Sequence, residues 1–290
     1  MNQSTKMKRA VLTGSSGLIG GALKERLVEN GYEIVKCFDS REGSPISEID
    51  KFEPTEQIDE IFHLAAHCKV AESIENPEKT FNANVLGTFK VFEFARKHKV
   101  KKVVYFSSSR VLHAEKNPYT ASKLYGEELC KAYWKCYGIK YLIIRPSTVY
   151  GPFFDKTERL VHKFIMNALT NKPLVIYGDP ETKTLDFTYV SDFIQGLFAV
   201  LRQDNKEFNI SGGCEYNVYK LAKMIIEKTN SKSEIIVKPA EKEQPQQVHV
   251  DISPLLALGF RPRVSLEEGI ERTINFYQKW LKENKQLVSA

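Results

Sequence analysis

Tyr119 and Lys123 stand four residues apart, in the order Tyr-x-x-x-Lys, shortly after a run of three serines. On a helix that begins near Pro118 this spacing places both side chains on one face, so the phenol would lie beside the ammonium group. A fixed cation lowers the pKa of a tyrosine, whereas burial raises it. Such a phenol can exchange a proton with a sugar or alcohol oxygen, which Ser109 could hydrogen-bond. The alternative is structural, with Tyr119 in the core and Lys123 in solvent.

A glycine-rich stretch, TGSSGLIG at residues 13–20, follows a short apolar strand predicted for residues 10–12. Its glycines recur at every third position: Gly14, Gly17 and Gly20. Helical periodicity then begins at Leu18. A strand-to-helix turn of this kind brings backbone N–H groups and a helix N-terminus against a diphosphate, and glycines permit the close approach. The stretch therefore predicts a dinucleotide site.

An acid follows the second predicted strand, which covers residues 33–38. Asp39 lies 19 residues beyond Gly20, about where a carboxylate binds the hydroxyls of the adenosine ribose. The same carboxylate would repel a 2′-phosphate, so we expect NAD as the cofactor. Arg41 leaves NADP open, because a guanidinium two residues later could pair with that phosphate.

The elements that must position these residues alternate along the first half of the chain. Strands are predicted for residues 10–12, 33–38, 46–49, 60–64, 101–106 and 140–144, and helices for residues 18–29, 77–97 and 118–137. This alternation indicates an α/β fold with a doubly wound parallel (Rossmann) sheet. Ligands bind at the carboxyl ends of such strands, which collects Gly14, Asp39, Ala65, Ser107, Ser109 and Pro146 in one crevice.

The second half carries a looser mixture of helices and strands. We predict an NAD-binding domain over residues 1–152 and a smaller α/β substrate lobe over residues 153–290, which can interleave with the first. The helical stretches 77–97 and 119–137 could pair across a two-fold axis in a homodimer, although sheet packing explains their amphipathic pattern equally well.

Composition narrows the function classes. The 290 residues are 42% hydrophobic and 27% charged, as in ordinary globular proteins, and the net charge is +6. Lysines are spread along the chain, which favours an anionic small-molecule substrate over nucleic acid. The N-terminal stretch is polar and no apolar run reaches the length of a membrane span, so we expect no membrane partner and a cytoplasmic location.

Cysteine and histidine positions favour structural roles. The five cysteines are odd in number and lack metal-ligand spacing, which fits reduced thiols. His63 and His67 could form a metal pair, but we interpret them as a buried strand-end histidine and a loop histidine. No metal site is predicted.

In these residues and in further motifs, the chain resembles the extended short-chain dehydrogenase/reductase superfamily, in particular its NAD-dependent nucleotide-sugar epimerase and dehydratase branch. The resemblance covers nearly the whole chain. Its markers are TGSSGLIG (13–20), HLAA (63–66), NVLGT (84–88), SSS (107–109), YTASK (119–123), RPSTVYGP (145–152), IYGD (176–179) and DFTYVSD (186–192).

The resemblance implies a role for each matching position. The pyrophosphate of NAD would be held by Gly14, Gly17, Leu18, Ile19 and Gly20, and the adenosine ribose by Asp39. The cofactor would be lined by Leu64, Ala65, Ala66, Ser107 and Pro146. Asn84 would support the active-site helix, Tyr119 would be the acid/base and Lys123 would hold the nicotinamide ribose. Ser109 and Thr148 would contact the sugar.

Several positions depart from the branch's pattern. Only nine residues separate Ser109 from Tyr119, and Arg110-Val111 replaces the Asp-Glu pair with which dehydratases eliminate water. Thr148 replaces a common asparagine. Two arginines that clamp the diphosphate are missing, at Leu185 and near Glu241. Substitutes for them could be Lys183, His249, Arg159, Lys163 or Arg261.

Three functions compete. The first is an NAD-dependent nucleotide-sugar 4-epimerase, which oxidises sugar C4 transiently and re-reduces it from the other face. The second is a 4-keto-sugar reductase or related sugar-nucleotide dehydrogenase that turns over free NAD(P)H, suggested by the short segment after Ser109. The third is a dinucleotide-binding sensor with little catalysis, suggested by the missing arginines.

Overall fold

A six-stranded parallel sheet organises the first half of the chain, as predicted. The computed structural model describes residues 7–241 and 244–284, so residues 1–6 of the polar N-terminal stretch lie outside it. The strand order is β2-β1-β3-β4-β5-β9. Its members are β1 (Lys8–Thr13), β2 (Tyr32–Phe38), β3 (Glu60–His63), β4 (Lys102–Phe106), β5 (Lys140–Pro146) and β9 (Lys206–Ile210).

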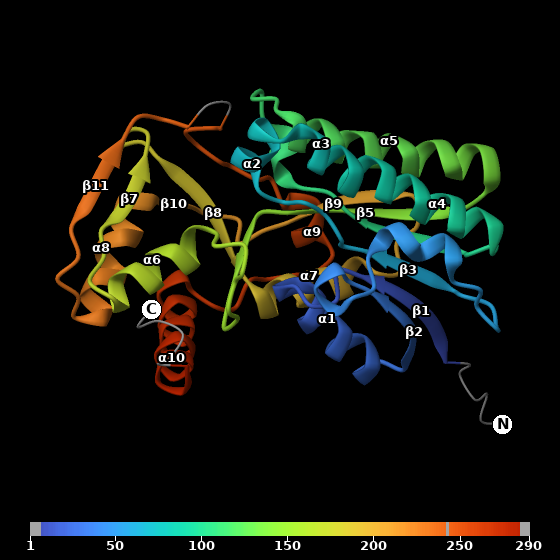
Figure 1. The fold of residues 1–290 in the computed structure, drawn as a ribbon, viewed down its shortest axis with the longest axis horizontal. Coiled ribbons are helices and arrows are strands. Elements are labelled where there is room, and N and C mark those ends of the chain that lie inside the picture. Colours follow the sequence, from blue (N-terminus) through green and yellow to red (C-terminus); the bar gives the residue numbers. More distant parts are fainter. Residues whose placement is uncertain (1–6, 242–243, 285–290) are drawn as a thin grey trace.

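Helices cover both faces of this sheet (Figure 1). One face carries α1 (Leu18–Glu29) and α7 (Val190–Val200), which contact each other. The other carries α4 (Gly87–Lys97) and α5 (Pro118–Tyr137), with the shorter α2 (Val70–Glu75) and α3 (Pro77–Thr80). Two buried apolar clusters fill the layers, one on each side of the strands, as expected when a parallel sheet is covered on both faces.

One predicted strand is wrong. Residues 46–49 belong to η2 (Ile46–Lys51), a 3₁₀-helix that packs against α4. Ile46 and Ile49 are three residues apart, and in a 3₁₀-helix that spacing places both on one face. A strand would have turned them to opposite faces. Ile49 is fully buried and Ile46 packs against the same cluster, so β2 is the edge strand of the sheet among residues 7–241 and 244–284.

The second half builds a smaller part and also returns to the first sheet. A three-stranded sheet holds β6 (Thr148–Tyr150), β8 (Thr184–Tyr189) and β10 (Glu215–Asn217), and a two-stranded one holds β7 (Leu174–Tyr177) and β11 (Ile235–Lys238). The helices are α6 (Leu160–Leu169), α8 (Val218–Thr229), α9 (Ser253–Ala257) and α10 (Leu266–Glu283). Both β9 and α7 lie beyond residue 152, so the chain crosses between the two parts, and one apolar cluster runs through both.

His63 has the buried position predicted for it, whereas Cys68, Cys136 and Cys214 are exposed. All five cysteines are unpaired. His63 is buried between the hydroxyls of Thr13 and Thr88, at 2.8 and 2.9 Å, and burial lowers the pKa of its ring to about 3. Within residues 7–241 and 244–284, no helix is long and apolar enough to cross a membrane.

Candidate active site

The N-terminus of α5 fixes the position of Tyr119. Asn117 caps the helix by accepting a hydrogen bond from the backbone N–H of Thr120 at 3.0 Å, and the Thr120 hydroxyl accepts one from the Asn117 N–H at 2.9 Å. Pro118 occupies the first helical position, where its fixed φ is pre-organised. This reciprocal capping box places Tyr119 in the first turn and Lys123 one turn later.

The Tyr119 phenol lies against the serine run and is 8% exposed. Burial raises the pKa of Tyr119 to about 12, while a hydrogen bond with Ser108 and the charges of Arg110 and Arg159 act in the opposite direction. The hydroxyl that hydrogen-bonds the phenol is that of Ser108, and the sugar contact expected of Ser109 remains a prediction. Ser108 has an extended backbone and lies between β4 and the next element. Ser109 is buried and begins that element, the 3₁₀-turn η4 (Ser109–Leu112).

Lys123 is buried one turn after Tyr119 on α5, and its ammonium binds a backbone carbonyl. Its ammonium donates to the carbonyl of Phe106 at 2.8 Å and lies 5.4 Å from the centre of the Tyr105 ring. Burial lowers the pKa of Lys123 to about 8. The charges of Arg110 and Arg159 act to lower the pKa of the Tyr119 phenol. Lys123 remains at the carboxyl end of β4.

A buried carboxylate that sequence reasoning missed braces the serine run. Glu127, one turn after Lys123, accepts a hydrogen bond from the Ser107 hydroxyl at 2.5 Å. Its two oxygens also accept from the Arg145 guanidinium at 2.8 and 2.6 Å. Charge-assisted bidentate pairs of this kind give strong geometric definition. They join the ends of β4 and β5 to the middle of α5.

Asn84 ties the active-site helix to the loop after β3. It lies in a π-helical turn, η3 (Phe81–Leu86), between α3 and α4, and such turns are frequent at functional sites. Its carbonyl accepts from the His67 N–H at 2.7 Å, and its amide donates to the His67 carbonyl and to the Ser122 hydroxyl, both at 2.9 Å. The Asn84 side chain therefore hydrogen-bonds three polar groups, two in the loop after β3 and one on α5.

Replacing Asn84 by alanine should destabilise the protein by about 2 kcal/mol, because three buried polar groups lose their partner. Urea unfolding measures the change. Asn82→Ala is the control, since Asn82 is exposed on the same π-turn and its loss should cost less than about 0.5 kcal/mol. Equal losses for the two variants would show that Asn84 does not link the segments.

The glycine turn lies against the segment after β3. Gly14 has a φ of +75°, and a Cβ placed there would come within 2.8 Å of the backbone nitrogen of Ala65. Ala65 and Leu64 are themselves held by hydrogen bonds from their N–H groups to the Thr13 hydroxyl at 3.0 and 3.1 Å. A Cβ at Gly20 would meet the Gly14 carbonyl at 2.0 Å. Turn, helix and segment 64–66 thus form one close-packed cradle.

The cradle fits a dinucleotide. The first turn of α1, which Gly17 precedes, has neither a side-chain cap nor an acidic residue, so its N–H groups are available to an anion. Leu18 and Ile19 stand in that turn. The small side chains of Ala65 and Ala66 are partly exposed on the facing segment. These residues could hold the two phosphates of a dinucleotide beside the helix N-terminus.

Two carboxylates stand at the far end of the cradle. Burial opposes ionisation of Asp39, but the N–H groups of Ser16 and Arg41, each 2.9 Å from a carboxylate oxygen, outweigh it and keep the pKa of Asp39 below its usual value. The second is Glu42, which sequence reasoning missed; it accepts from the Ser15 hydroxyl at 3.0 Å. Both would repel a 2′-phosphate, which favours NAD over NADP even with Arg41 nearby.

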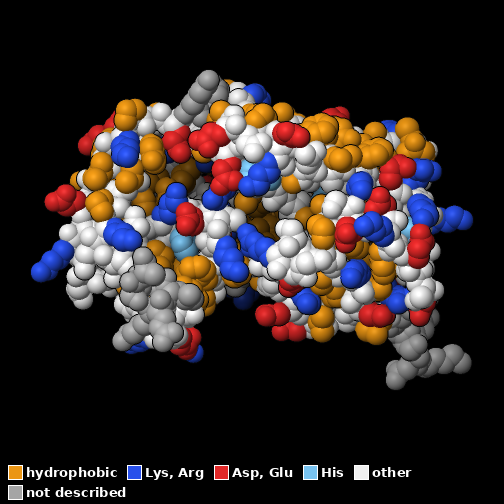
Figure 2. Space-filling model, viewed as in Figure 1, with side chains coloured by type: hydrophobic (Ala, Val, Ile, Leu, Met, Phe, Trp, Pro, Cys, Tyr) orange, Lys and Arg blue, Asp and Glu red, His pale blue; other side chains and the backbone are white. Residues whose placement is uncertain are grey.

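Cations gather where the two parts of the molecule face each other. Figure 2 shows Lys and Arg side chains around a hollow between them. The Arg159 guanidinium forms an ion pair with Asp155 at 2.6 Å. The charges of Arg110 and Arg159 lower the pKa of Tyr119, and the charge of Arg110 lowers that of Lys183. Burial, reinforced by the charge of Arg110, lowers the pKa of Lys183.

The remaining candidates lie at the end of β5 and in the smaller part. Pro146 ends β5 and Thr148 is half-buried in β6, opposite Phe187. The ammonium of Lys183 donates to the Pro245 carbonyl at 2.8 Å. The side chain of His249 is 71% exposed and its Nδ1 lies 3.4 Å from the Glu215 carboxylate, so it stands at the rim.

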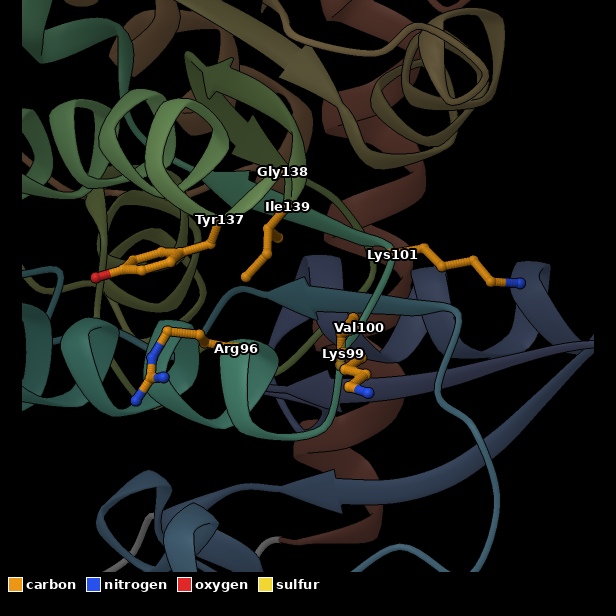
Figure 3. A pocket seen from close by; sticks show the side chains of 7 residues that line it. All are labelled: Arg96, Lys99, Val100, Lys101, Tyr137, Gly138 and Ile139. Carbon is orange, nitrogen blue, oxygen red and sulfur yellow. The ribbon is translucent and has the colours of Figure 1, made fainter.

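A hollow at the opposite end of the sheet carries no comparable chemistry (Figure 3). It lies where α4 and α5 end and where Lys101 leads into β4. The Arg96 guanidinium covers the Tyr137 ring at 5.5 Å. Ligands of doubly wound sheets bind at the carboxyl ends of the strands, and this hollow is at the amino ends.

Comparisons with known proteins agree with this geometry. Residues 10–211 match the family model described as "NAD dependent epimerase/dehydratase family". A relative from Methanocaldococcus jannaschii, named "Putative UDP-glucose 4-epimerase", is 31% identical and covers 95% of this chain and 99% of its own. UDP-glucuronic acid decarboxylase 1 of Xenopus tropicalis is 28% identical over 95% of this chain and 73% of its own. The crystal structure of a Thermotoga maritima UDP-glucose 4-epimerase with UDP-glucose superposes with a TM-score of 0.86 at 26% identity, covering 94% of this chain and 99% of that one.

Proposed function

The chain belongs to the NAD dependent epimerase/dehydratase family, whose cofactor is NAD, and on that premise we propose that it is a nucleotide-sugar 4-epimerase. The observation that carries the proposal is the buried Tyr119 phenol beside the Ser108 hydroxyl at the carboxyl edge of the sheet. Arg110 and Val111 follow the serines, so the acid pair that an elimination of water needs is absent from those two positions.

Each residue of the site has a part in the proposed reaction. Bound NAD supplies the oxidising power, because it takes a hydride from sugar C4 and returns it. As a phenolate, which the charges of Arg110 and Arg159 favour, Tyr119 would accept the proton from the C4 hydroxyl and later return it. Ser109, next to the Ser108 hydroxyl that meets the phenol, is proposed to hydrogen-bond the same sugar oxygen. Lys123 would turn from the Phe106 carbonyl to the nicotinamide ribose. The bracing of Ser107 by Glu127 keeps the strand end rigid, which preserves the alignment on which proton transfer depends.

The cradle is the proposed cofactor site. The diphosphate would lie on the N–H groups of Leu18 and Ile19, while the Gly17 N–H donates to the Gly14 carbonyl at 3.3 Å and so holds the turn, and Gly14 and Gly20 allow the approach. Asp39 would accept from the adenosine ribose hydroxyls, because each of its oxygens makes a single hydrogen bond to backbone and has a further lone pair. Asn84 would act indirectly, by holding the active-site helix against the loop after β3.

The substrate would lie across the cation-lined hollow. Nucleotide sugars carry a diphosphate, and the positive charge of Arg159 and Lys183 would attract it to the mouth of the site. Lys183 stands two residues from Leu185, where the family's diphosphate arginine is missing. A lysine there binds phosphate as a point charge rather than in bidentate fashion. Thr148 and His249 are proposed as further substrate contacts at the rim.

We also propose that the protein is a homodimer that pairs through α4 and the turn before it. Phe81, Leu86 and Phe89 are 54%, 42% and 41% exposed on this stretch. Large apolar side chains that gather on one face mark an interaction surface. Sedimentation of the wild type against Phe81→Ser/Phe89→Ser tests the proposal; two dimers or two monomers would contradict it.

The test of the proposed function is interconversion of sugar epimers. The purified protein, with bound NAD confirmed by mass spectrometry, is incubated with UDP-glucose, UDP-galactose, their N-acetyl forms and the two corresponding uronates. We expect at least one pair to interconvert with no net change in cofactor. Stoichiometric consumption of NADH or NADPH would instead indicate a keto-sugar reductase, and no interconversion at all would remove the epimerase.

A further inference from the structure

Helix α10 holds the segment that joins β6 to α6. Residues 151–159 of this segment form neither helix nor strand. Figure 1 shows α10 beside α6, and the two helices contact each other. On α10, Tyr277 and Trp280 are three residues apart, a spacing that places both side chains on one helix face. Both side chains contact the segment, so a helix from the end of the chain determines where the segment lies.

The Tyr277 hydroxyl joins three groups. It donates to the Phe153 carbonyl at 2.8 Å, because a carbonyl can only accept. Its oxygen therefore accepts from the Asp155 N–H at 3.4 Å and from Nδ1 of His162 at 2.8 Å, which must carry the ring proton. The Tyr277 side chain is 1% exposed. Loss of its oxygen would leave three groups without a partner in the interior, which is unfavourable.

An aromatic stack holds the residue between these two backbone contacts. The rings of Trp280 and Phe154 lie 3.8 Å apart between their centres, with 19° between their planes. The His162 ring meets the Phe154 ring edge-on at 5.1 Å. Both arrangements are favourable for aromatic pairs. Helix α10 therefore holds the backbone of residues 153–155 and the side chain in their middle.

Asp155 connects this anchor to Arg159. Its buried carboxylate accepts from the Thr157 N–H at 3.0 Å and from Nε of Arg159 at 2.6 Å. Only Nε of the guanidinium takes part in this ion pair. Among residues 7–241 and 244–284, its two terminal nitrogens donate to no group of the protein. The guanidinium is thus fixed at one side and free to bind a ligand at the other.

The segment lies beside the cofactor cradle. A Cβ on Gly151, at its start, would come within 3.8 Å of Cδ1 of Leu18, which stands in the first turn of α1. At its other end, the charge of Arg159 lowers the pKa of the Tyr119 phenol. The anchored segment therefore runs from the cradle to a cation within electrostatic reach of the reacting group.

We propose that Tyr277 is a positioning residue for substrate binding. Through the backbone of residues 153–155 and the Asp155 carboxylate, it fixes the Arg159 guanidinium, whose terminal nitrogens bind the diphosphate of the nucleotide sugar. This inference rests on the proposed function, which supplies that diphosphate. Two parallel N–H groups match the oxygens of a phosphate. A guanidinium that is already held in place loses less conformational entropy when the ligand binds.

Calorimetric titration of the NAD-loaded protein with UDP-glucose and with inorganic pyrophosphate tests the inference without turnover. Tyr277→Phe keeps the ring and should weaken binding of both probes about 10-fold, the scale of one or two lost hydrogen bonds. Arg159→Gln should weaken it about 100-fold. The matched control is Tyr150→Phe, because the buried Tyr150 hydroxyl also bonds α10, at the Leu266 carbonyl 3.4 Å away. This control should bind both probes as the wild type does.

A double-mutant cycle separates positioning from packing. In the Arg159→Gln background, Tyr277→Phe should change affinity by less than about 2-fold, because the group that it positions is gone. Trp280→Leu, a change at a partly exposed position, provides a second cycle if Tyr277→Phe does not fold. It should weaken binding about 5-fold in the wild type and leave Arg159→Gln unchanged. Equal losses in both backgrounds would overturn the inference, as would wild-type affinity in Tyr277→Phe or failure of the wild type to bind either probe.

Turnover distinguishes failure of this inference from failure of the proposed function. In Tyr277→Phe, KM for the sugar that interconverts should rise about 10-fold while kcat stays within about 2-fold, because binding of substrate and transition state weakens equally. If no sugar interconverts but the cycle shows the coupling, the epimerase is wrong and the role of Tyr277 stands. If sugars interconvert but the losses are additive, the epimerase stands and the positioning role is wrong.

Discussion

Replacing Tyr119 by phenylalanine is expected to lower kcat for sugar interconversion about 1,000-fold in a protein that stays folded and keeps its NAD. The change removes one oxygen from a side chain that is 8% exposed, and the ring still fills its place. General acid–base catalysis by one positioned group contributes about 10²–10⁴-fold to rate. Nothing else in the first turn of α5 can take over, because its neighbours Pro118 and Ala121 carry no ionisable group.

The measurement is single-turnover oxidation of the sugar, followed through the absorbance of reduced nicotinamide. Tyr125→Phe is the matched control: Tyr125 lies on the same helix, is half-buried, and should retain wild-type kcat. Calorimetry should show substrate affinity within about 3-fold of wild type in both variants, because the phenol acts mainly in the transition state. Retention of more than a tenth of wild-type kcat by Tyr119→Phe would mean that another group moves the proton.

The framework of the site could be predicted because its signals are local. Helix α5 covers residues 118–137 as predicted, and α1 begins at Leu18 after the glycine turn. Residue spacing along a strand or helix fixes which face a side chain occupies. The alternation of strands and helices therefore predicted the parallel sheet. The sheet in turn predicted that the site lies at the carboxyl ends of its strands.

The errors arose where tertiary contacts decide. Residues 46–49 were too short a stretch to identify from their composition, although the three-residue spacing of Ile46 and Ile49 fits one face of a 3₁₀-turn, and packing against α4 accompanies that turn. Within the serine run, the hydroxyl that meets Tyr119 is that of Ser108, a contact for which the sequence holds no signal. Local sequence carries no information on either contact.

Charge partners across the sheet were also beyond sequence reasoning. In the sequence, Glu127 is one of several charged residues of a predicted helix. Only the folded chain brings Arg145 and Ser107 to its carboxylate, from β5 and from the end of β4. The Nη1 of Arg110 has no hydrogen-bond partner among residues 7–241 and 244–284, which is likewise a property of the folded chain. From the sequence, Arg110 was notable only because it stands where dehydratases have an acidic residue.

Replacing Gly14 by alanine is expected to destabilise the protein by about 3 kcal/mol and to weaken NAD binding at least 100-fold. A left-handed backbone costs an alanine about 1–2 kcal/mol. At Gly14, with its φ of +75°, the added Cβ would also stand 2.8 Å from the nitrogen of Ala65, which is backbone and cannot swing aside. Relief requires segment 64–66 to move against its hydrogen bonds to Thr13, and that movement deforms the cradle on both sides of the cofactor.

Gly31→Ala separates the cost of the left-handed backbone from the cost of the contact with Ala65. Gly31 has nearly the same φ, +78°, but a Cβ there would meet nothing within 4 Å. This variant should lose only the conformational part, about 1–2 kcal/mol, and should bind NAD as the wild type does. Urea unfolding and calorimetric titration with NAD measure both quantities. Equal behaviour of the two variants would mean that the close contact between the glycine turn and Ala65 contributes nothing to the cofactor site, and the proposed position of the diphosphate would then be wrong.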